Sequence, residues 1–464
     1  MIEPTNQITF NTPLIPPRGW NAPGEAVTLY EGTLTGFRQG ARQGKIELTL
    51  GAKPSLEWSV EPHPDDFWEL GNDGAVITTV DRTPPMEFTA NTRRNNAGWI
   101  NGTSNGDQKT PLQRLVTQWL NLPLSASNAI LGEKTANGVH RRRGRWSIEV
   151  DGWTVTIDQR PDLSAVLRTA TEQISSVLTH VMELKRTGGE EFSVAEGREL
   201  SECLRVSFSF GFGRKVVPVL PTGYDANGEV VWEQWFSPLI DRAQKIGSGW
   251  LYDGSSDDCA ELISCAVRAF ADTSRRGTTR FQMLMATEAV ATGFVEQRIL
   301  TAAPALESLA WTTLVLGNLM PRGDFKKCAA EDKLRYLLKS AGVPTSVDAT
   351  ELPALAKYAA DHRIDGPTAV TRIRNRLVHP EILADDLYAR DGLSVDVWRL
   401  SLHYVTLAVL HSIGYQGSYQ MQLKLGGWAG ETHPVPWTDP MTAPTGPVPL
   451  PPVGRAVRGR SRSR

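Results

Sequence analysis

Hydrophobic and polar residues alternate along much of the first third of the chain, which is the pattern of half-buried β-strands. The clearest case is 145–158 (RWSIEVDGWTVTID), where alternation continues on both sides of Asp151-Gly152, a pair that favours a tight hairpin turn. We therefore predict a β-rich module over residues 1–250, either a sandwich or a barrel. Its first strands are predicted at 28–37, 45–50, 56–60 and 75–80.

The middle of this module departs from simple alternation. Apolar residues at 166, 167, 174, 177, 178 and 181 recur close to helical spacing, which predicts one long helix near 162–186. Farther on, 206–212 (VSFSFGF) and 215–220 are typical of strands. We therefore expect residues 192–250 to continue the β-rich module.

From residue 257 the periodicity becomes helical, and we interpret 257–437 as an up-and-down helical bundle with short connections. Pro304 and Pro321 are expected to break helices, because proline lacks the N–H that a helix interior needs. Pro367 suits the first turn of the helix that begins near it. The predicted helices are 257–273, 279–300, 305–319, 331–339, 352–362, 366–379 and 395–413.

The last residues, 438–464, are rich in proline and then in arginine. Such a segment cannot bury a core, so we expect a disordered tail. The whole pattern predicts an α+β protein, in which a β-rich N-terminal module precedes an all-α bundle.

Composition narrows the classes of function. The formal net charge is −2, so contact with a nucleic acid would need a local basic patch. No apolar run approaches the roughly 20 residues of a membrane span, and the N-terminus lacks the pattern of a secretory signal. We expect a cytoplasmic protein with free thiols and no metal or cofactor, because its scattered cysteines form no CxxC pair: Cys203, Cys259, Cys265 and Cys328.

A short polar segment at the end of the predicted helix 366–379 brings Arg374, Asn375 and His379 close together. On a helix, Asn375 and His379 would share a face, and Arg374 would be offset by about 100°. RNA cleavage without a metal needs a base for the 2′-OH and an acid for the leaving 5′-oxygen, and histidine suits both roles. Arginine matches two phosphate oxygens at once, and the neighbouring Arg372 and Arg376 would add phosphate contacts.

The alternative is a structural one. Arg374 and Asn375 would then belong to a solvated helix face, and His379 would cap the helix end, where a cation interacts favourably with the dipole.

The segment Arg374-Asn375-x-x-x-His379 resembles the signature of the HEPN superfamily, whose ribonucleases carry an arginine followed by four to six residues and a histidine. Downstream residues are similar to the Apea-like branch of that family, and the resemblance covers about 280–437. These residues are Trp398, the helix through Tyr404 and Leu410, Gly414-Tyr415-x-Gly417-x-Tyr419, Gly430-Glu431 and Val435-Pro436-Trp437.

The resemblance implies a HEPN-like bundle that acts as a metal-independent endoribonuclease in antiviral abortive infection. It also implies a homodimer in which the two motifs face each other, so that one histidine serves as acid and the other as base. The N-terminal module would then sense a viral trigger or restrain the nuclease. The alternative function is a non-catalytic dimeric scaffold that binds a nucleotide, RNA or a partner protein.

Basic residues cluster most densely just before the predicted hairpin, at Arg141, Arg142, Arg143 and Arg145. They could contact RNA phosphates, with Trp146 and Trp153 as stacking surfaces. The alternative is a solvated loop that leads into the hairpin.

Three further residues of the helical region carry expectations. His403 and His411 lie on an apolar helix, and we interpret them as core or interface residues. Glu307 could pair with Arg374 inside the bundle or occupy an exposed rim; the sequence leaves both open.

Overall fold

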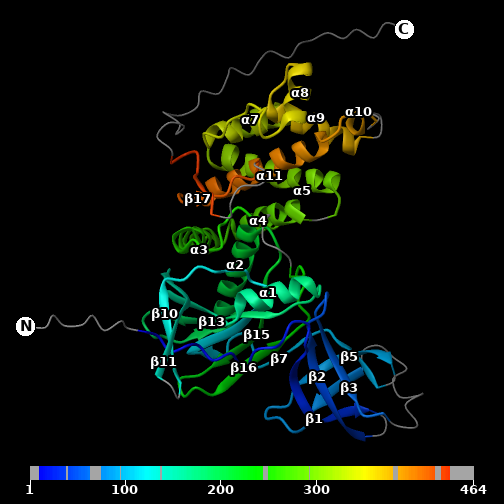
Figure 1. Cartoon of the computed structure of the whole chain (residues 1–464), viewed down its shortest axis with the longest axis vertical. Coiled ribbons are helices and arrows are strands. Elements are labelled where there is room, and N and C mark those ends of the chain that lie inside the picture. Colours follow the sequence, from blue (N-terminus) through cyan, green and yellow to red (C-terminus); the bar gives the residue numbers. More distant parts are fainter. Residues whose placement is uncertain are drawn as a thin grey trace, which may run out of the picture. The chain divides into compact units, whose positions relative to one another are not determined.

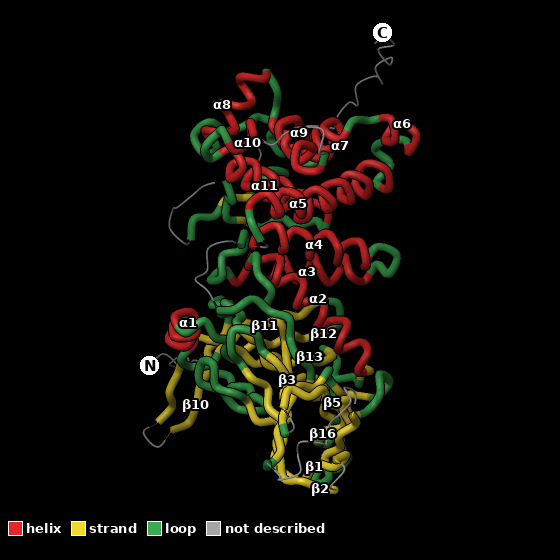
Figure 2. The backbone as a smooth tube through the Cα atoms, turned by 90° about the vertical axis from the view of Figure 1, so that its right-hand side faces the viewer, coloured by secondary structure: helices red, strands yellow, loops and turns green. Residues whose placement is uncertain are grey.

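The chain folds into two compact units, Met1–Ala271 and Asp272–Arg464, in a computed structural model. The structure describes residues 10–37, 40–62, 75–94, 96–135, 138–243, 249–291, 293–379, 385–423 and 430–438. The first unit is rich in strands and the second in helices, so the predicted α+β class is confirmed (Figure 2). The predicted tail lies outside the described residues beyond residue 438.

A closed six-stranded antiparallel barrel forms the N-terminal part of the first unit, with strand order β1-β2-β3-β6-β5-β4 (Figure 1). Alternate residues point inward, so that Leu34, Ile46 and Trp58 are almost completely buried. At the closure, Gly36 has φ +109° and any Cβ would collide with the Val76 carbonyl of the partner strand. The strands are β1 Val27–Phe37, β2 Gly40–Thr49, β3 Ser55–Val60, β4 Ala75–Thr79, β5 Glu87–Arg94 and β6 Ala97–Ile100.

An eight-stranded antiparallel sheet follows, with strand order β10-β11-β12-β13-β9-β15-β16-β7. The predicted hairpin at Asp151-Gly152 is confirmed, and both turn residues have positive φ, as a tight two-residue turn requires. The strands are β7 Thr103–Asn105, β9 Arg114–Leu120, β10 Ala129–Thr135, β11 Gly138–Val150, β12 Trp153–Gln159, β13 Leu178–Arg186, β15 Val217–Tyr224 and β16 Val230–Trp235. A small additional pair joins β8 Pro111–Leu112 to β14 Phe192–Ser193.

The long helix predicted near 162–186 is wrong. Helix α1 covers only Leu163–Glu172, and the chain turns at Ile174, where φ is +53°, before it enters β13. Strand β13 lies between β12 and β9 and is buried on both faces over most of its length. Its apolar residues therefore do not alternate, and such a run cannot be told from a helix by periodicity alone.

The strand predicted at 206–212 is also wrong, because these residues end helix α2, Val194–Phe212. Every residue from Val206 to Phe212 is buried, so the alternation of aromatic and small residues does not mark an exposed face. A capping box at its start, Ser193 with Glu196, was the available sequence signal. Helix α3, Ser256–Ala271, packs against α2, and the division between the units therefore falls later than the expected 250–257.

The second unit is a bundle in which α5 and α11 contact most of the other helices (Figure 2). The helix predicted at 279–300 is two helices, because the chain turns at Gly293, where φ is +56°. The break predicted at Pro304 is wrong: α5 runs through it and continues as a π-helical segment, Trp311–Leu316. The helices are α4 Arg276–Ala291, α5 Val295–Ala310, α6 Arg322–Lys327, α7 Ala330–Ser340, α8 Pro353–His362, α9 Gly366–Val378, α10 Asp385–Tyr388 and α11 Leu393–Ser412.

Two described segments are long and apolar enough to cross a membrane by length and composition alone, Val295–Leu316 and Leu393–Ser412. The most apolar stretch of α11 is 83% buried within its own unit. Its polar side chains also serve internal contacts: Asp396 accepts hydrogen bonds from the N–H groups of Ala354 and Leu355 at the start of α8. The apolar composition of α11 is therefore explained by its place in the core.

Candidate functional site

Helix α9 carries the Arg–Asn–His motif, and its first turn is fixed by a charged clamp. Asp365 caps the helix by accepting from the Thr368 N–H at 3.1 Å, and Arg335 of α7 grips both of its carboxylate oxygens at 2.7 and 3.0 Å. Burial alone would raise the pKa of Asp365, but the bonds from Arg335 and Thr368 outweigh it and lower that pKa to about 2. Gly366 follows, and no larger residue fits there because a Cβ would meet the Tyr404 hydroxyl.

The motif residues occupy the last turn of α9. Arg374 is half-buried, and its Nη1 donates to Asn375 Oδ1 at 2.9 Å. His379 is exposed and stands just past the helix, in an extended conformation, although its N–H still donates to the Asn375 carbonyl at 2.9 Å. The expectation that His379 lies on a helical face with Asn375 is therefore wrong, because the helix ends one residue earlier.

Arg374 faces a pocket of about 140 Å³ within the second unit. The pocket lies among α5, α7, α9 and α11, which Figures 1 and 2 both show side by side. Its walls are mostly apolar, and its charged residues are Glu307, Lys333 and Arg374. The expectation of a purely solvated face for Arg374 therefore does not describe its position.

The two options for Glu307 can now be compared. Glu307 is exposed and lines the same pocket as Arg374, and no ion pair joins the two among the described contacts. The rim position is therefore the observed one. Lys333 was not singled out from the sequence, because only the packing of α7 against α5 brings it to this pocket; its ammonium lies 4.5 Å from the Phe325 ring centroid.

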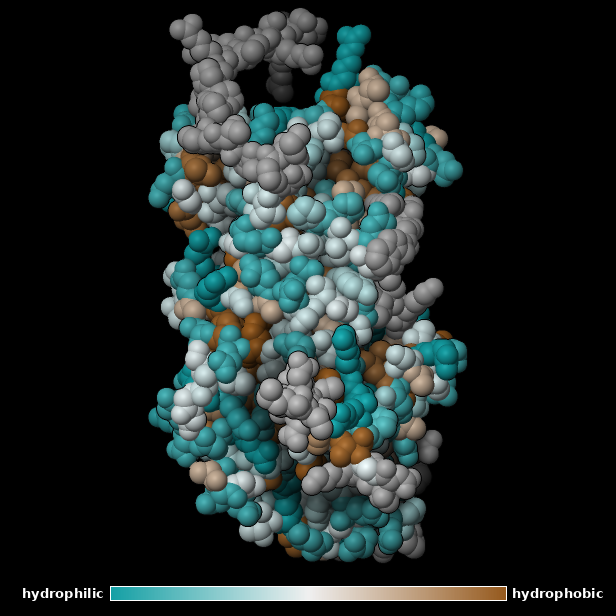
Figure 3. All heavy atoms as spheres, turned by 60° about the vertical axis from the view of Figure 1, so that its left-hand side comes forward, coloured by the Kyte–Doolittle hydropathy of each residue, from teal (hydrophilic) through white to brown (hydrophobic). Residues whose placement is uncertain are grey.

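The other two arginines of the motif segment differ in exposure. Arg372 is exposed and Arg376 is half-buried on the last turns of α9. Val378, directly before His379, has 47% of its surface exposed. On the face shown in Figure 3, hydrophobic residues form small patches separated by hydrophilic residues.

The two histidines of α11 have structural positions, as expected. Burial lowers the pKa of His403 to about 4, and its ring centroid lies 6.0 Å from that of Tyr419. His411 packs edge-on against Trp437 at 5.0 Å, and burial lowers its pKa as well. The segments 414–419 and 435–437 thus fold back onto α11, and the Trp437 indole donates to the Tyr415 carbonyl at 2.7 Å.

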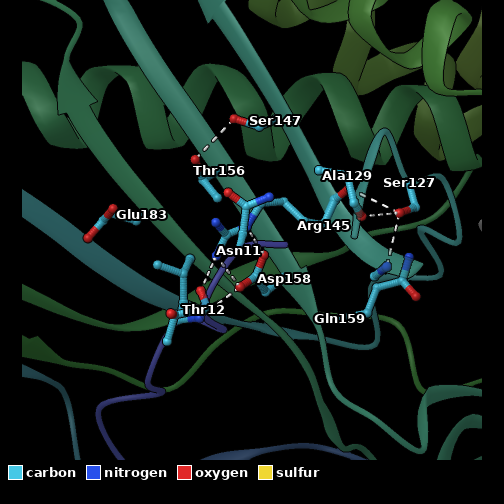
Figure 4. A network of polar contacts seen from close by, with 12 residues as sticks. Asn11, Thr12, Ser127, Ala129, Arg145, Ser147, Thr156, Asp158, Gln159 and Glu183 are labelled. Atoms are coloured by element: carbon cyan, nitrogen blue, oxygen red, sulfur yellow. Dashed lines mark hydrogen bonds and ion pairs between the residues drawn. The ribbon is translucent and has the colours of Figure 1, made fainter. Parts of the chain in front are cut away.

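The basic run of the first unit lies in strand β11 rather than in a loop, and it pairs with β10. Arg145 forms a two-pronged ion pair with Asp158, with both N–O distances 2.7 Å, and also donates to the Thr12 carbonyl at 2.9 Å (Figure 4). Arg142 donates to the Gln159 carbonyl at 2.7 Å, and burial lowers its pKa. These two guanidinium groups are thus engaged within the fold.

The other arginines of this run and the two nearby tryptophans differ in their exposure to solvent, and therefore in whether a ligand could reach them. Arg141 lies over the Phe10 ring at 5.5 Å, and both Arg141 and Arg143 are exposed. Trp146 is completely buried and packs against Phe208, and Trp153 is only 6% exposed. The expectation that these tryptophans are stacking surfaces is therefore wrong: both rings build the core.

The fold and the candidate site define an α+β protein whose helical unit carries an Arg–Asn–His segment beside a charged, apolar-walled pocket. Residues 107–246 match the family model of the YopA central domain, and residues 285–434 match that of the YopA C-terminal domain. The motif and the pocket both lie within the second matched segment.

One relative is the "SPbeta prophage-derived uncharacterized protein YopA" of Bacillus subtilis (strain 168). It is 28% identical over 311 residues, which are 66% of this chain and 69% of the relative. No solved structure matches the chain.

The ion pair of Arg145 predicts a stability effect. Asp158 is 1% exposed, so Arg145→Met would leave a buried carboxylate without its cation, and we expect a loss of about 3–5 kcal/mol in the free energy of unfolding. Arg143→Met, on the same strand but exposed, should stay within about 0.5 kcal/mol of wild type. Urea unfolding of the full chain measures both. Unchanged stability of Arg145→Met, with weaker RNA binding, would instead favour a ligand-binding role for this residue.

The clamp at Asp365 predicts a pH dependence. Since the folded-state pKa is about 2 and the usual value 3.8, the ionised carboxylate stabilises the fold above about pH 4, and this stabilisation is lost as the pH falls toward 2. Asp365→Asn keeps a capping oxygen and loses the ion pair, whereas Asp365→Ala loses both and should cost about 1–2 kcal/mol at pH 7. Thermal unfolding of the three proteins between pH 3 and pH 7 tests this. A wild-type advantage over Asp365→Asn that does not shrink on acidification would refute the clamp.

Proposed function

We propose that this protein is a metal-independent endoribonuclease of HEPN type, in which His379 transfers protons and Arg374 holds the scissile phosphate. The observation that carries the proposal is the geometry at the end of α9. Arg374 is half-buried and held by Asn375, and His379 is exposed five residues on. A pre-positioned guanidinium can stabilise the extra negative charge of the transition state without first being ordered.

The proposed reaction needs both a base and an acid, but each chain carries only one motif histidine, His379. In the proposed reaction a base removes the 2′-OH proton, the oxygen attacks the adjacent phosphate, and an acid protonates the 5′-oxygen as the P–O bond breaks. Two copies related by a two-fold axis would bring two His379 side chains to one cleft, and Arg372 and Arg376 would add phosphate contacts. The exposure of His379 and of Val378 (47%) is compatible with such an interface.

In a cell we propose a cytoplasmic effector of abortive infection, held inactive until the N-terminal unit binds a viral trigger. The relative in Bacillus subtilis is described as prophage-derived, so a related protein occurs in a phage-derived element. In the first unit, Arg142 and Arg145 are engaged in holding the fold, so the proposal places the chemistry in the second unit.

A second candidate function is a non-catalytic scaffold of the same dimeric form. It is favoured by the position of His379 at the C-terminal end of α9. A protonated histidine there interacts favourably with the helix dipole and need not take part in a reaction. The scaffold would bind RNA or a nucleotide through Arg374 and would not cut it.

His379→Ala separates the two functions. Under the nuclease proposal it lowers the rate of RNA cleavage in EDTA by roughly 10²–10⁴-fold, because general acid–base catalysis contributes about that much. The exposed side chain leaves room for alanine, so the melting temperature should stay unchanged. Cleavage of labelled single-stranded RNA by the full chain is the measurement.

The matched control is His433→Ala, a half-exposed histidine of the same unit that pairs loosely with Glu431 at 3.9 Å. It should cleave at the wild-type rate. Equal rates for wild type and His379→Ala would contradict the nuclease proposal. RNA binding without cleavage by the wild type would favour the scaffold.

A further inference from the structure

The pocket beside Arg374 has the size of a single aromatic ring. Its volume is about 140 Å³, and an engineered apolar cavity of about 150 Å³ in another protein takes up benzene. The space exists because α5 presents small side chains there, Ala302, Ala303 and Ala310. Ile299, Leu306, Leu334 and Val370 supply the apolar walls against which a flat ring could pack.

The charged residues that line the pocket restrict which ring-shaped ligands can bind there. The ionised carboxylate of Glu307 can accept hydrogen bonds but cannot donate them. Lys333 and Arg374 can donate hydrogen bonds but cannot accept them. A ring that suits them carries an N–H donor on one edge and an acceptor oxygen, with a negative charge nearby for the cations. A pyrimidine nucleotide has this arrangement if its base is cytosine.

Cytosine and uracil differ at the atom that Glu307 would meet. Cytosine presents its N4 amino group, a donor that acidic side chains accept from, and uracil presents the O4 oxygen, which a carboxylate repels. A single pyrimidine ring fits the volume of this pocket. Between the two pyrimidines, the carboxylate therefore favours cytosine.

We propose that this pocket binds a cytosine base of single-stranded RNA next to the phosphate held by Arg374, so that cleavage occurs beside cytidine. Glu307 accepts from the N4 amino group, and Lys333 faces the strand as a second cation. The cleavage part rests on the proposed function, whereas the base preference is a binding property that can be measured without any cleavage.

The binding experiment uses the full chain carrying His379→Ala, so that RNA stays intact. We expect it to bind oligocytidylate roughly tenfold more tightly than oligouridylate, the usual range for one good base-edge contact. Adding Glu307→Gln should bring this ratio close to one, because an amide can accept from cytosine or donate to uracil after a flip. Glu331→Gln, the same charge change on α7 at a residue that does not itself line the pocket, should keep the ratio.

Equal binding of the two RNAs, or a preference that Glu307→Gln leaves unchanged, overturns the proposal. A cleavage assay with wild type on RNA of mixed sequence separates this outcome from failure of the nuclease. Cleavage without preference for cytidine removes the pocket proposal and keeps the nuclease. A Glu307-dependent preference for oligocytidylate without cleavage keeps the pocket as a binding site and removes the nuclease.

Discussion

The position of α9 depends on the ion pair between Arg335 and Asp365. One guanidinium from α7 meets the carboxylate that caps α9, and this contact sets both the start and the rotation of the motif helix. Because Arg374 lies about two and a half turns farther on, that rotation directs it toward the pocket among α5, α7, α9 and α11. At Gly366, α9 lies so close to Tyr404 of α11 that a Cβ could not be accommodated. The ion pair, the pocket and the motif therefore all lie within one packed group of helices, α5, α7, α9 and α11.

Much of this arrangement could be predicted from the sequence. The α+β class, the hairpin at Asp151-Gly152 and the helix that carries the motif follow from periodicity and from turn and cap residues, which are local signals. The two errors in secondary structure at β13 and at the end of α2 share one physical cause. Strand β13 and the end of α2 are buried on all sides, so burial removes the polar half of the pattern that distinguishes strand from helix. The pocket could not be predicted either, because alanines on α5 meet Lys333 and Arg374 only after the helices pack.

The first unit shows that a basic run is a poor guide to function by itself. Arg145 is held by Asp158 and Arg142 by a backbone carbonyl, and the neighbouring tryptophans build the core. Arginine serves here as a structural cation that satisfies a buried carboxylate. In the second unit the same residue type lines an accessible pocket, where its charge remains available to a ligand. The surroundings of each guanidinium, more than its position in a motif, decide what it can do.

The central claim is that two copies of the motif form one catalytic site, and a defined heterodimer tests it most directly. Co-expression of wild-type and His379→Ala chains with different affinity tags yields a dimer with one motif histidine. If one His379 is the acid and the other the base, this heterodimer lacks one of the two groups and should cleave RNA at least about 100-fold more slowly than the wild-type dimer. Half of the wild-type rate would mean that each chain works alone and would contradict the shared site.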